Sequence, residues 1–382
     1  MSNVDFKQVL ALAEKYKPDM VKFLRDMVAI PSESCEEREV VLRIKEEMEK
    51  VGFDKVMIDA MGNIIGSIGH GSHLIAFDSN VDTKHITESK NWVLEQYRDL
   101  GDEIQLDEQC GNLHKIGLAC AVYAGKVVKN LGLEDDFTFM VTGTVQKEEC
   151  AGLCWQFIIE EDNIKPEFVV LAEPTDCDIY LGHLGRLSVK ITDSTGSIEQ
   201  NINDLTDWNM KKDVSFGMSK MNISNIMHKD TSGADYVIVD IPLRKEESYK
   251  AIFEEVSNIP SIKEHNARIM ICNYEESSFT GLMYPSQMAF PSWKLPAESE
   301  LFSSLEESYK FIFKNDPKIG EWKALTNGTG IMGRHNIKCV GFGPGDHKHI
   351  YNKIRKNDIV LTTAVYALLP FVYLDDLKKR TK

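Results

Sequence analysis

Apolar residues recur every three or four positions near the start of the chain. Residues 5–28 show this period, and residues 40–51 repeat it up to Gly52. Because 3.6 residues complete a helical turn, this spacing places one apolar stripe on a helix. We therefore predict two amphipathic helices. The first has a break or kink at Pro18, and the second ends at Gly52, where glycine tolerates the left-handed backbone of a helix end.

Short apolar runs then alternate with helical segments up to residue 186. The runs that have the length and composition of strands lie at 55–58, 63–68, 74–77, 137–142 and 168–172. Helical spacing returns at 116–131 and 152–161. Continuous apolar strands between helices are typical of a sheet covered on both faces. This part of the sequence therefore predicts an α/β domain.

The pattern changes after residue 186. Alternating strands are predicted at 187–191, 214–221, 234–243 and 267–272, with a helix at 246–257 and a polar, irregular stretch at 193–213. The α/β pattern resumes at residue 295 and ends in a helix at 358–374 that is interrupted near Pro370. We expect residues 1–186 and 293–382 to form one α/β domain with a mixed sheet. A smaller α+β lid domain, residues 187–292, is expected to interrupt it.

Composition and charge narrow the class of protein. With 43% hydrophobic and 27% charged residues over 382 positions, the chain is ordinary for a soluble globular protein. A net charge of −15 disfavours nucleic acid as a partner, because such binding depends on Lys and Arg that neutralise phosphates. No window approaches the roughly 18 consecutive apolar residues of a membrane span, and the first residues are too polar for a secretory signal. We expect a cytoplasmic protein with no membrane partner, whose eight scattered cysteines are reduced.

Acidic and histidine-bearing segments follow several of the predicted strands. They are residues 78–83, 147–149, 172–176 and 343–349. Carboxylates and imidazoles that converge from separate strand ends are the ligands that a hard or borderline divalent metal ion requires. Each segment alone is also typical of a helix cap or a turn.

The order of these segments points to a known family. Residues 142–148 read TGTVQKE, residues 173–175 read EPT, residues 326–328 read TNG and residues 341–345 read GFGPG. The sequence thereby resembles the dinuclear zinc peptidases and amidohydrolases that include acetylornithine deacetylase, succinyl-diaminopimelate desuccinylase, aminoacylase and carboxypeptidase G. The resemblance implies a zinc-peptidase α/β domain with a lid domain that often mediates dimerisation, and a site for two zinc ions.

Several functional positions of that family are altered in this chain. The aspartate that orients a ligand histidine is kept as Asp82, but Asn80 stands where that histidine is expected. Leu113 occupies the position of the bridging aspartate. Of the paired glutamates, the ligand is kept as Glu148, whereas the general base is replaced by Lys147.

Among the remaining functional positions of the family, some residues are kept and others are replaced. Glu173 keeps a ligand position, and His349, with His347 as the alternative, matches the last histidine ligand. Glu199 stands at or near the place of a lid histidine that polarises the substrate. The residues that match the family's substrate pocket are Asn327, Gly328 and Arg334.

Three hypotheses follow from the altered positions. The first is a catalytically degenerate homologue that acts as a binding, regulatory or assembly subunit, with no zinc or one weakly bound zinc ion. In it, the ammonium of Lys147 neutralises Asp82, Glu148 and Glu173 without a metal. A small anionic ligand could still bind beside Arg334 without turnover.

The second hypothesis is an active single-metal hydrolase of amide bonds in N-acyl amino acids or small peptides. Its ligands would be Glu148, Glu173 and His349, joined by His114 or His347, with Glu149 as the base. The third is an assembly module that forms a homodimer or a hetero-assembly through the lid.

Overall fold

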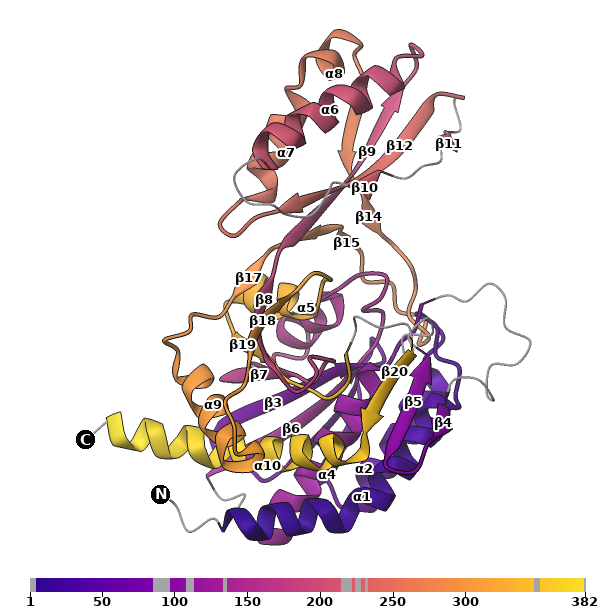
Figure 1. Cartoon of the computed structure of the whole chain (residues 1–382). Helices are drawn as coiled ribbons and strands as arrows, with labels where there is room; N and C mark the ends of the chain where they lie inside the picture. The colour runs from indigo at the N-terminus through magenta and orange to yellow at the C-terminus, as the bar shows by residue number, and fades with distance from the viewer. Residues whose placement is uncertain are drawn as a thin grey trace.

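The structure, a computed structural model, consists of a large lower body and a small upper body (Figure 1). It describes residues 5–84, 97–107, 113–132, 136–213, 222–223, 228–230, 233–346 and 351–380. The predicted strand at 214–221 and the two histidines His347 and His349 lie outside these residues.

A nine-stranded mixed sheet forms the centre of the large body. Its strands run in the order β1 (Lys55–Ile58), β2 (Ile64–Ile68), β6 (Phe137–Thr144), β3 (His73–Asn80), β7 (Phe168–Leu171), β19 (Lys338–Gly341), β8 (Ile179–His183) and β17 (Trp293–Lys294), and β18 (Ile319–Trp322) also pairs with β8. The four central strands β6, β3, β7 and β19 are mutually parallel. Their carboxyl ends therefore meet at one edge of the sheet.

Helices cover this sheet, and their packing buries the central strands. They are α1 (Phe6–Val28), α2 (Arg38–Val51), α4 (His114–Leu131), α5 (Leu153–Glu160), α9 (Glu300–Phe313) and α10 (Lys356–Arg380). Every residue of β7 is buried, and so are the last six of β3, as expected for a sheet with both faces covered. The predicted α/β class is confirmed.

The interruption predicted near Pro370 is wrong, and of the break or kink predicted at Pro18 the break is wrong. Helix α1 continues through Pro18, and α10 continues through Pro370. A proline removes one backbone donor from a helix, but packing on several neighbours can offset that loss. Helix α10 packs on α1, α4 and α9.

Helix α10 is also long and apolar enough, by length and composition alone, to cross a membrane. Most of its apolar window is buried inside the fold, which is the usual pattern of a core helix in a globular domain.

The small body has its own sheet and its own core. Its strands are β9 (Gly185–Asp193), β10 (Asn222–Ile223), β11 (His228–Lys229), β12 (Asp235–Leu243), β13 (Arg268–Ile271) and β16 (Ala289–Phe290), and its helices are α6 (Ile198–Asp213), α7 (Tyr249–Ser257) and α8 (Pro260–Glu264). The stretch predicted to be irregular at 193–213 therefore contains a helix. Only a narrow stripe of α6, formed by Ile198, Asn201 and Leu205, is buried, so its polar composition concealed the helical period.

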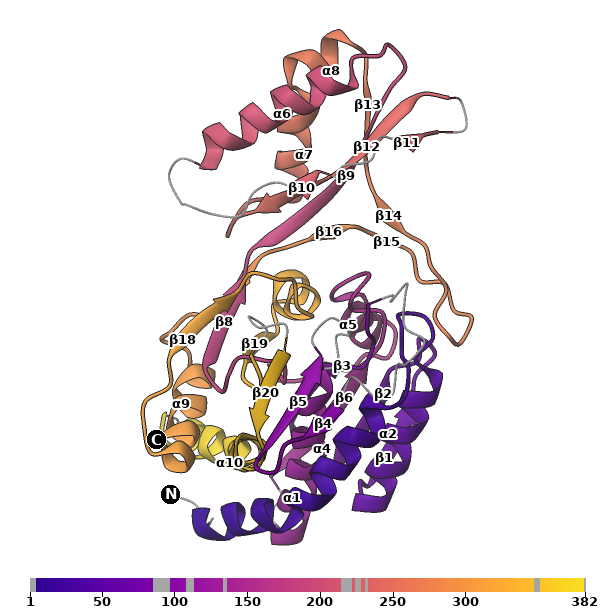
Figure 2. The same cartoon turned by 45° about the vertical axis from the view of Figure 1, so that its right-hand side comes forward.

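A hairpin from the small body reaches back to the large body (Figure 2). Its strands are β14 (Asn273–Tyr274) and β15 (Ser286–Gln287). Arg38 donates a hydrogen bond to the Phe279 carbonyl at 3.0 Å, and the Thr280 hydroxyl donates to the Ala60 carbonyl at 2.7 Å. A separate three-stranded sheet of β4 (Tyr97–Asp99), β5 (Glu103–Asp107) and β20 (Tyr351–Arg355) was not predicted.

His183 lies where the chain leaves the large body for the small one. The Thr326 backbone N–H can only donate, so the His183 Nε2 atom accepts its hydrogen bond at 3.0 Å. The Nδ1 atom, 2.6 Å from the Leu184 carbonyl, must then carry the proton. The ring is therefore neutral, and burial lowers the pKa of His183 from 6.5 to about 4.

We predict that this histidine makes folding stability fall in mild acid. The unfolded chain takes up a proton as the pH drops through 6.5, whereas folded His183 resists it until about pH 4. Stability from this group is fully present above pH 6.5, and about 2 kcal/mol of it is lost between pH 7 and pH 5. Urea unfolding of wild type and His183→Gln at both pH values measures this.

The glutamine variant should lose less stability than wild type over the same interval. His70→Gln, at an exposed histidine of the same body, is the matched control and should behave as wild type. A pH dependence of unfolding that is equal in wild type and His183→Gln would contradict the prediction.

Candidate functional site

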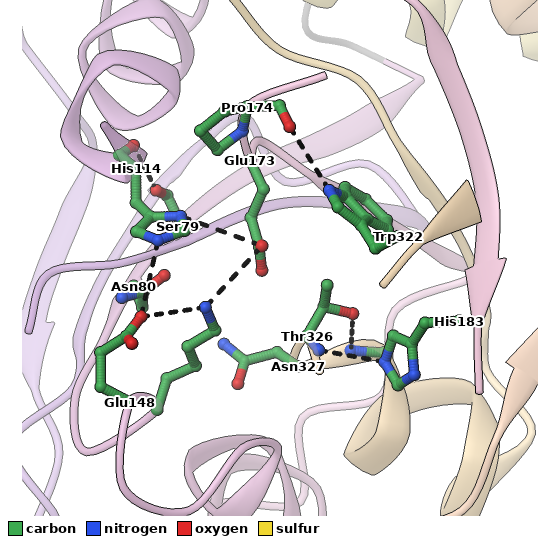
Figure 3. A network of polar contacts seen from close by, with 12 residues as sticks. Ser79, Asn80, His114, Glu148, Glu173, Pro174, His183, Trp322, Thr326 and Asn327 are labelled. Carbon is green, nitrogen blue, oxygen red and sulfur yellow. Dashed lines mark hydrogen bonds and ion pairs between the residues drawn. The ribbon is translucent and has the colours of Figure 1, made fainter. Parts of the chain in front are cut away.

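The carboxyl ends of the central strands gather five ionisable side chains, which we call the strand-end cluster: Asp82, His114, Lys147, Glu148 and Glu173. Asp82 follows β3, Lys147 and Glu148 follow β6, Glu173 follows β7, and His114 is the first residue of α4. Parallel strands place these positions at one edge of the sheet, where loops of α/β proteins carry function. Figure 3 shows His114, Glu148 and Glu173 pointing toward one another.

Two bases alternate with two carboxylates in a closed ring. The Lys147 Nζ atom donates to Glu148 Oε1 at 3.1 Å and lies 3.9 Å from Glu173 Oε2. On the other side, His114 Nε2 lies 3.5 Å from Glu148 Oε1, and His114 Nδ1 lies 3.9 Å from Glu173 Oε2. Lysine and histidine thus each bridge the same pair of glutamates.

Lys147 is held in its charged form. Its side chain is only 7% exposed, and burial by itself disfavours an ammonium. The nearby charges of Glu148, Glu173 and Asp82 outweigh burial and raise the pKa of Lys147 above its ordinary 10.5. Burial by itself would raise the pKa of Glu148. The charge of Lys147 nevertheless holds this pKa well below its usual value. At neutral pH, Lys147 cannot accept a proton.

The other members of the strand-end cluster are shifted mainly by burial. Burial raises the pKa of Glu173 to about 7, since Lys147 only partly compensates it. Burial and the Glu148 charge raise the pKa of Asp82 to about 6. Burial, together with the charge of Lys147, lowers the pKa of His114 to about 4. The cluster is thus a buried site with a positive charge fixed at Lys147.

Asp82 is fixed by three donors rather than by a histidine. Ser34 Oγ donates to it at 2.6 Å, the Glu148 backbone N–H at 2.8 Å, and Asn80 Nδ2 at 3.0 Å. Asp82 therefore orients Asn80, at the position where the related peptidases have a ligand histidine. The Asn80 oxygen remains as the only potential metal donor of that side chain.

The described residues do not fit a pair of bridged zinc ions. Leu113, at the bridging position, is a buried hydrocarbon side chain without a donor atom. The Lys147 ammonium stands between Glu148 and Glu173, the two carboxylates that would be ligands. Within the described ranges, no three His, Cys, Asp or Glu side chains are grouped to hold a metal ion.

The predicted substrate-pocket residues make internal contacts. Asn327 Nδ2 donates to Asp78 Oδ2 and to Thr144 Oγ1, both at 2.9 Å, and Asn327 Oδ1 accepts from the Gly152 N–H at 3.0 Å. Asn327 is fully buried, so it ties the strand ends to the loop before β19.

Gly328 and Arg334 lie close by. A Cβ atom at Gly328 would come within 2.3 Å of the Trp293 ring, so only glycine fits there. The Arg334 guanidinium donates to the Ala289 carbonyl of the small body. Of the other candidates, Glu149 is exposed outside the cluster, and Glu199 is exposed in the first turn of α6.

Sequence analysis named His114 only as an alternative ligand and did not single out His183. His114 enters the cluster because Ser79 Oγ donates to the His114 carbonyl at 2.6 Å and so fixes the start of α4 beside the end of β3. The position of His114 directly after Leu113 was the one available signal. For His183, the signal was an apolar strand that ends in a histidine, a weak pattern by itself.

Comparison with known proteins shows which proteins this chain resembles. No family model matches it. The uncharacterized protein YgeY of Escherichia coli K12 is 41% identical over 397 aligned positions, which cover 97% of this chain and 98% of YgeY. A probable succinyl-diaminopimelate desuccinylase of Staphylococcus aureus is 23% identical over 64% of this chain and 60% of that protein.

Solved structures show the same fold. The aminopeptidase PepT of Bacillus cereus superposes with a TM-score of 0.70 at 16% identity, over 94% of this chain and 99% of PepT. The Bacillus subtilis protein YXEP, described as a dinuclear metal-binding peptidase of the M20 family, gives 0.66 at 13% identity, over 95% and 99% of the two chains. The chain therefore belongs to the same family as YgeY, and its fold is that of the M20 metallopeptidases.

Proposed function

We propose that this protein is a non-hydrolytic relative of the M20 peptidases that acts as a small-molecule binding or regulatory subunit. The observation that carries the proposal is the buried Lys147 ammonium between Glu148 and Glu173. In this proposal, Lys147 supplies the positive charge that metal ions supply in the metallopeptidases.

Hydrolysis of an amide requires a group that takes a proton from the attacking water. A charged lysine whose pKa is raised further cannot do so near neutral pH. The only neighbouring carboxylate on the same loop outside the cluster is Glu149, which is exposed. The loss of a bridging carboxylate at Leu113 adds to the loss of the base.

The electrostatics also support an ammonium in place of a metal. Asp82 and Glu173 are buried and the Glu148 side chain is only 9% exposed, so the like charges of the three carboxylates repel strongly in this space. Lys147 is the one fully charged base of the strand-end cluster, since His114 is held neutral. Removing one partner of a buried ion pair is costly because the other charge is left uncompensated.

A single-metal amide hydrolase is the second candidate. It is favoured by one observation: Asn80 Oδ1 and Glu173 Oε1 are buried without a hydrogen-bond partner within the described residues. A metal ion held by these oxygens and His114 would be repelled by the nearby Lys147 ammonium. In this candidate, His347 or His349 would supply a further ligand.

We predict that the purified protein hydrolyses neither N-acyl amino acids nor dipeptides, with or without added Zn²⁺, Co²⁺ or Mn²⁺. The reason is the loss of the general base, which alone usually lowers rates by about 100-fold to 10,000-fold. A chromogenic or ninhydrin assay over a substrate panel measures this. Metal-dependent turnover that follows the protein through purification and disappears in Glu173→Gln would favour the second candidate instead.

We also predict that Lys147→Met lowers the free energy of unfolding by about 3–5 kcal/mol in EDTA. The variant leaves Glu148 and Glu173 without their common cation. Lys165→Met, at an exposed lysine of the same body, is the matched control and should change stability by about 0.5 kcal/mol or less. A Lys147→Met variant as stable as Lys165→Met would contradict the proposal.

Lys147→Glu should separate charge replacement from simple packing. It restores the glutamate of the related peptidases, so it should lower the melting temperature in EDTA and regain part of the loss when Zn²⁺ is added. Lys147→Met, which adds no metal donor, should regain nothing. Melting temperatures in EDTA that are equal for wild type and both variants would show that Lys147 does not replace a metal charge.

A further inference from the structure

Three buried acceptor atoms at the strand-end cluster have no hydrogen-bond partner within the described residues. They are Asn80 Oδ1, His114 Nδ1 and Glu173 Oε1. Asn80 is completely buried, and Glu173 is 3% exposed. Buried polar atoms are nearly always paired in folded proteins, so three orphans at one place indicate a missing partner.

The three atoms come from three elements that meet at the same edge of the sheet. Asp78 of β3 pairs with Leu171 of β7, and the Ala172 N–H donates to the Asp78 carbonyl at 2.7 Å. Two residues further along each chain, Asn80 and Glu173 stand at corresponding positions, so their side chains share one face. Figure 3 shows both side chains, with the His114 ring, at this edge of the sheet.

All three atoms are hydrogen-bond acceptors. The Nε2 atom of His114 faces the Glu148 carboxylate at 3.5 Å, which places the ring proton on Nε2 and leaves a lone pair on Nδ1. That lone pair faces Glu173 Oε2 at 3.9 Å, another acceptor. The missing partner must therefore donate several hydrogen bonds.

The charge of the strand-end cluster also selects the partner. Asp82, Glu148 and Glu173 face the buried cation of Lys147. Among the described residues, Lys84 also approaches Glu148, at 4.0 Å, but its side chain is exposed. The balance is negative, which favours a cation over the anion that Arg334 suggested. Lys147 lies 3.9 Å from Glu173, so it repels a dication there twice as strongly as a monocation.

We infer that the strand-end cluster binds the ammonium group of a primary amine, held by Glu173 Oε1, Asn80 Oδ1 and His114 Nδ1. An ammonium carries three N–H donors and one positive charge, which matches three acceptors and a residual negative charge. The inference rests on the proposed function, because it requires Lys147 rather than a metal between the two glutamates. The ligand class is thus a small molecule with a free primary amino group.

Methylammonium chloride is the minimal probe, and tetramethylammonium chloride, which has the same charge but no N–H, is its control. Both are titrated at equal ionic strength in EDTA, with melting temperature and calorimetric heat as the readouts. Methylammonium should raise the melting temperature of wild type in a saturable manner, and tetramethylammonium should not. Glu173→Gln should weaken methylammonium binding by about tenfold or more, because a charge-assisted hydrogen bond is lost.

Glu46→Gln, at an exposed glutamate of α2, is the matched variant and should bind methylammonium as wild type does. Equal shifts with the two salts, no shift with methylammonium, or unchanged affinity in Glu173→Gln would each overturn the amine site. The comparison of the two salts on wild type needs no variant, so a poorly folded Glu173→Gln leaves the test intact. If the amine site fails while the Lys147 variants behave as predicted, the non-hydrolytic function stands alone.

Discussion

The ion pairs of Lys147 with Glu148 and Glu173 are the interaction on which the rest of the strand-end cluster depends. Three carboxylates that are largely shielded from water at the end of a parallel sheet repel one another unless a cation stands among them. In this chain the cation is a side chain, with its Nζ atom 3.1 Å from one glutamate and 3.9 Å from the other. The positive charge that balances these carboxylates is therefore part of the polypeptide chain itself.

Hydrogen bonds from neighbouring segments hold the strand-end cluster in place. Asn327 joins Asp78 and Thr144 under the cluster, and three donors fix Asp82 beside it. The loop that holds Asn327 also bonds to His183 through the Thr326 N–H, where the chain passes into the small body. Hydrogen bonds thereby connect the cluster to the joint between the two bodies.

Local sequence patterns predicted those parts of the fold whose apolar stripes are wide. The helix predicted at 116–131 is α4 at His114–Leu131, and the apolar runs at 137–142 and 168–172 fall within or overlap β6 and β7. Helix α6 was missed because it buries only a narrow stripe, and the β5–β20 pair was missed because it joins residues 103–107 to residues 351–355. Pairing over such a separation leaves no local signal. In the site, the replacements at Asn80, Leu113 and Lys147 followed from family resemblance, whereas the His114 bridge depends on how α4 is anchored by Ser79.

The most direct measurement of the central claim is a crystal structure of the protein grown with Zn²⁺, with anomalous diffraction recorded at the zinc absorption edge. If Lys147 replaces the metal charge, we expect ordered density for its side chain between Glu148 and Glu173 and no anomalous peak there. A zinc peak between these two glutamates, with the Lys147 side chain turned away, would contradict it.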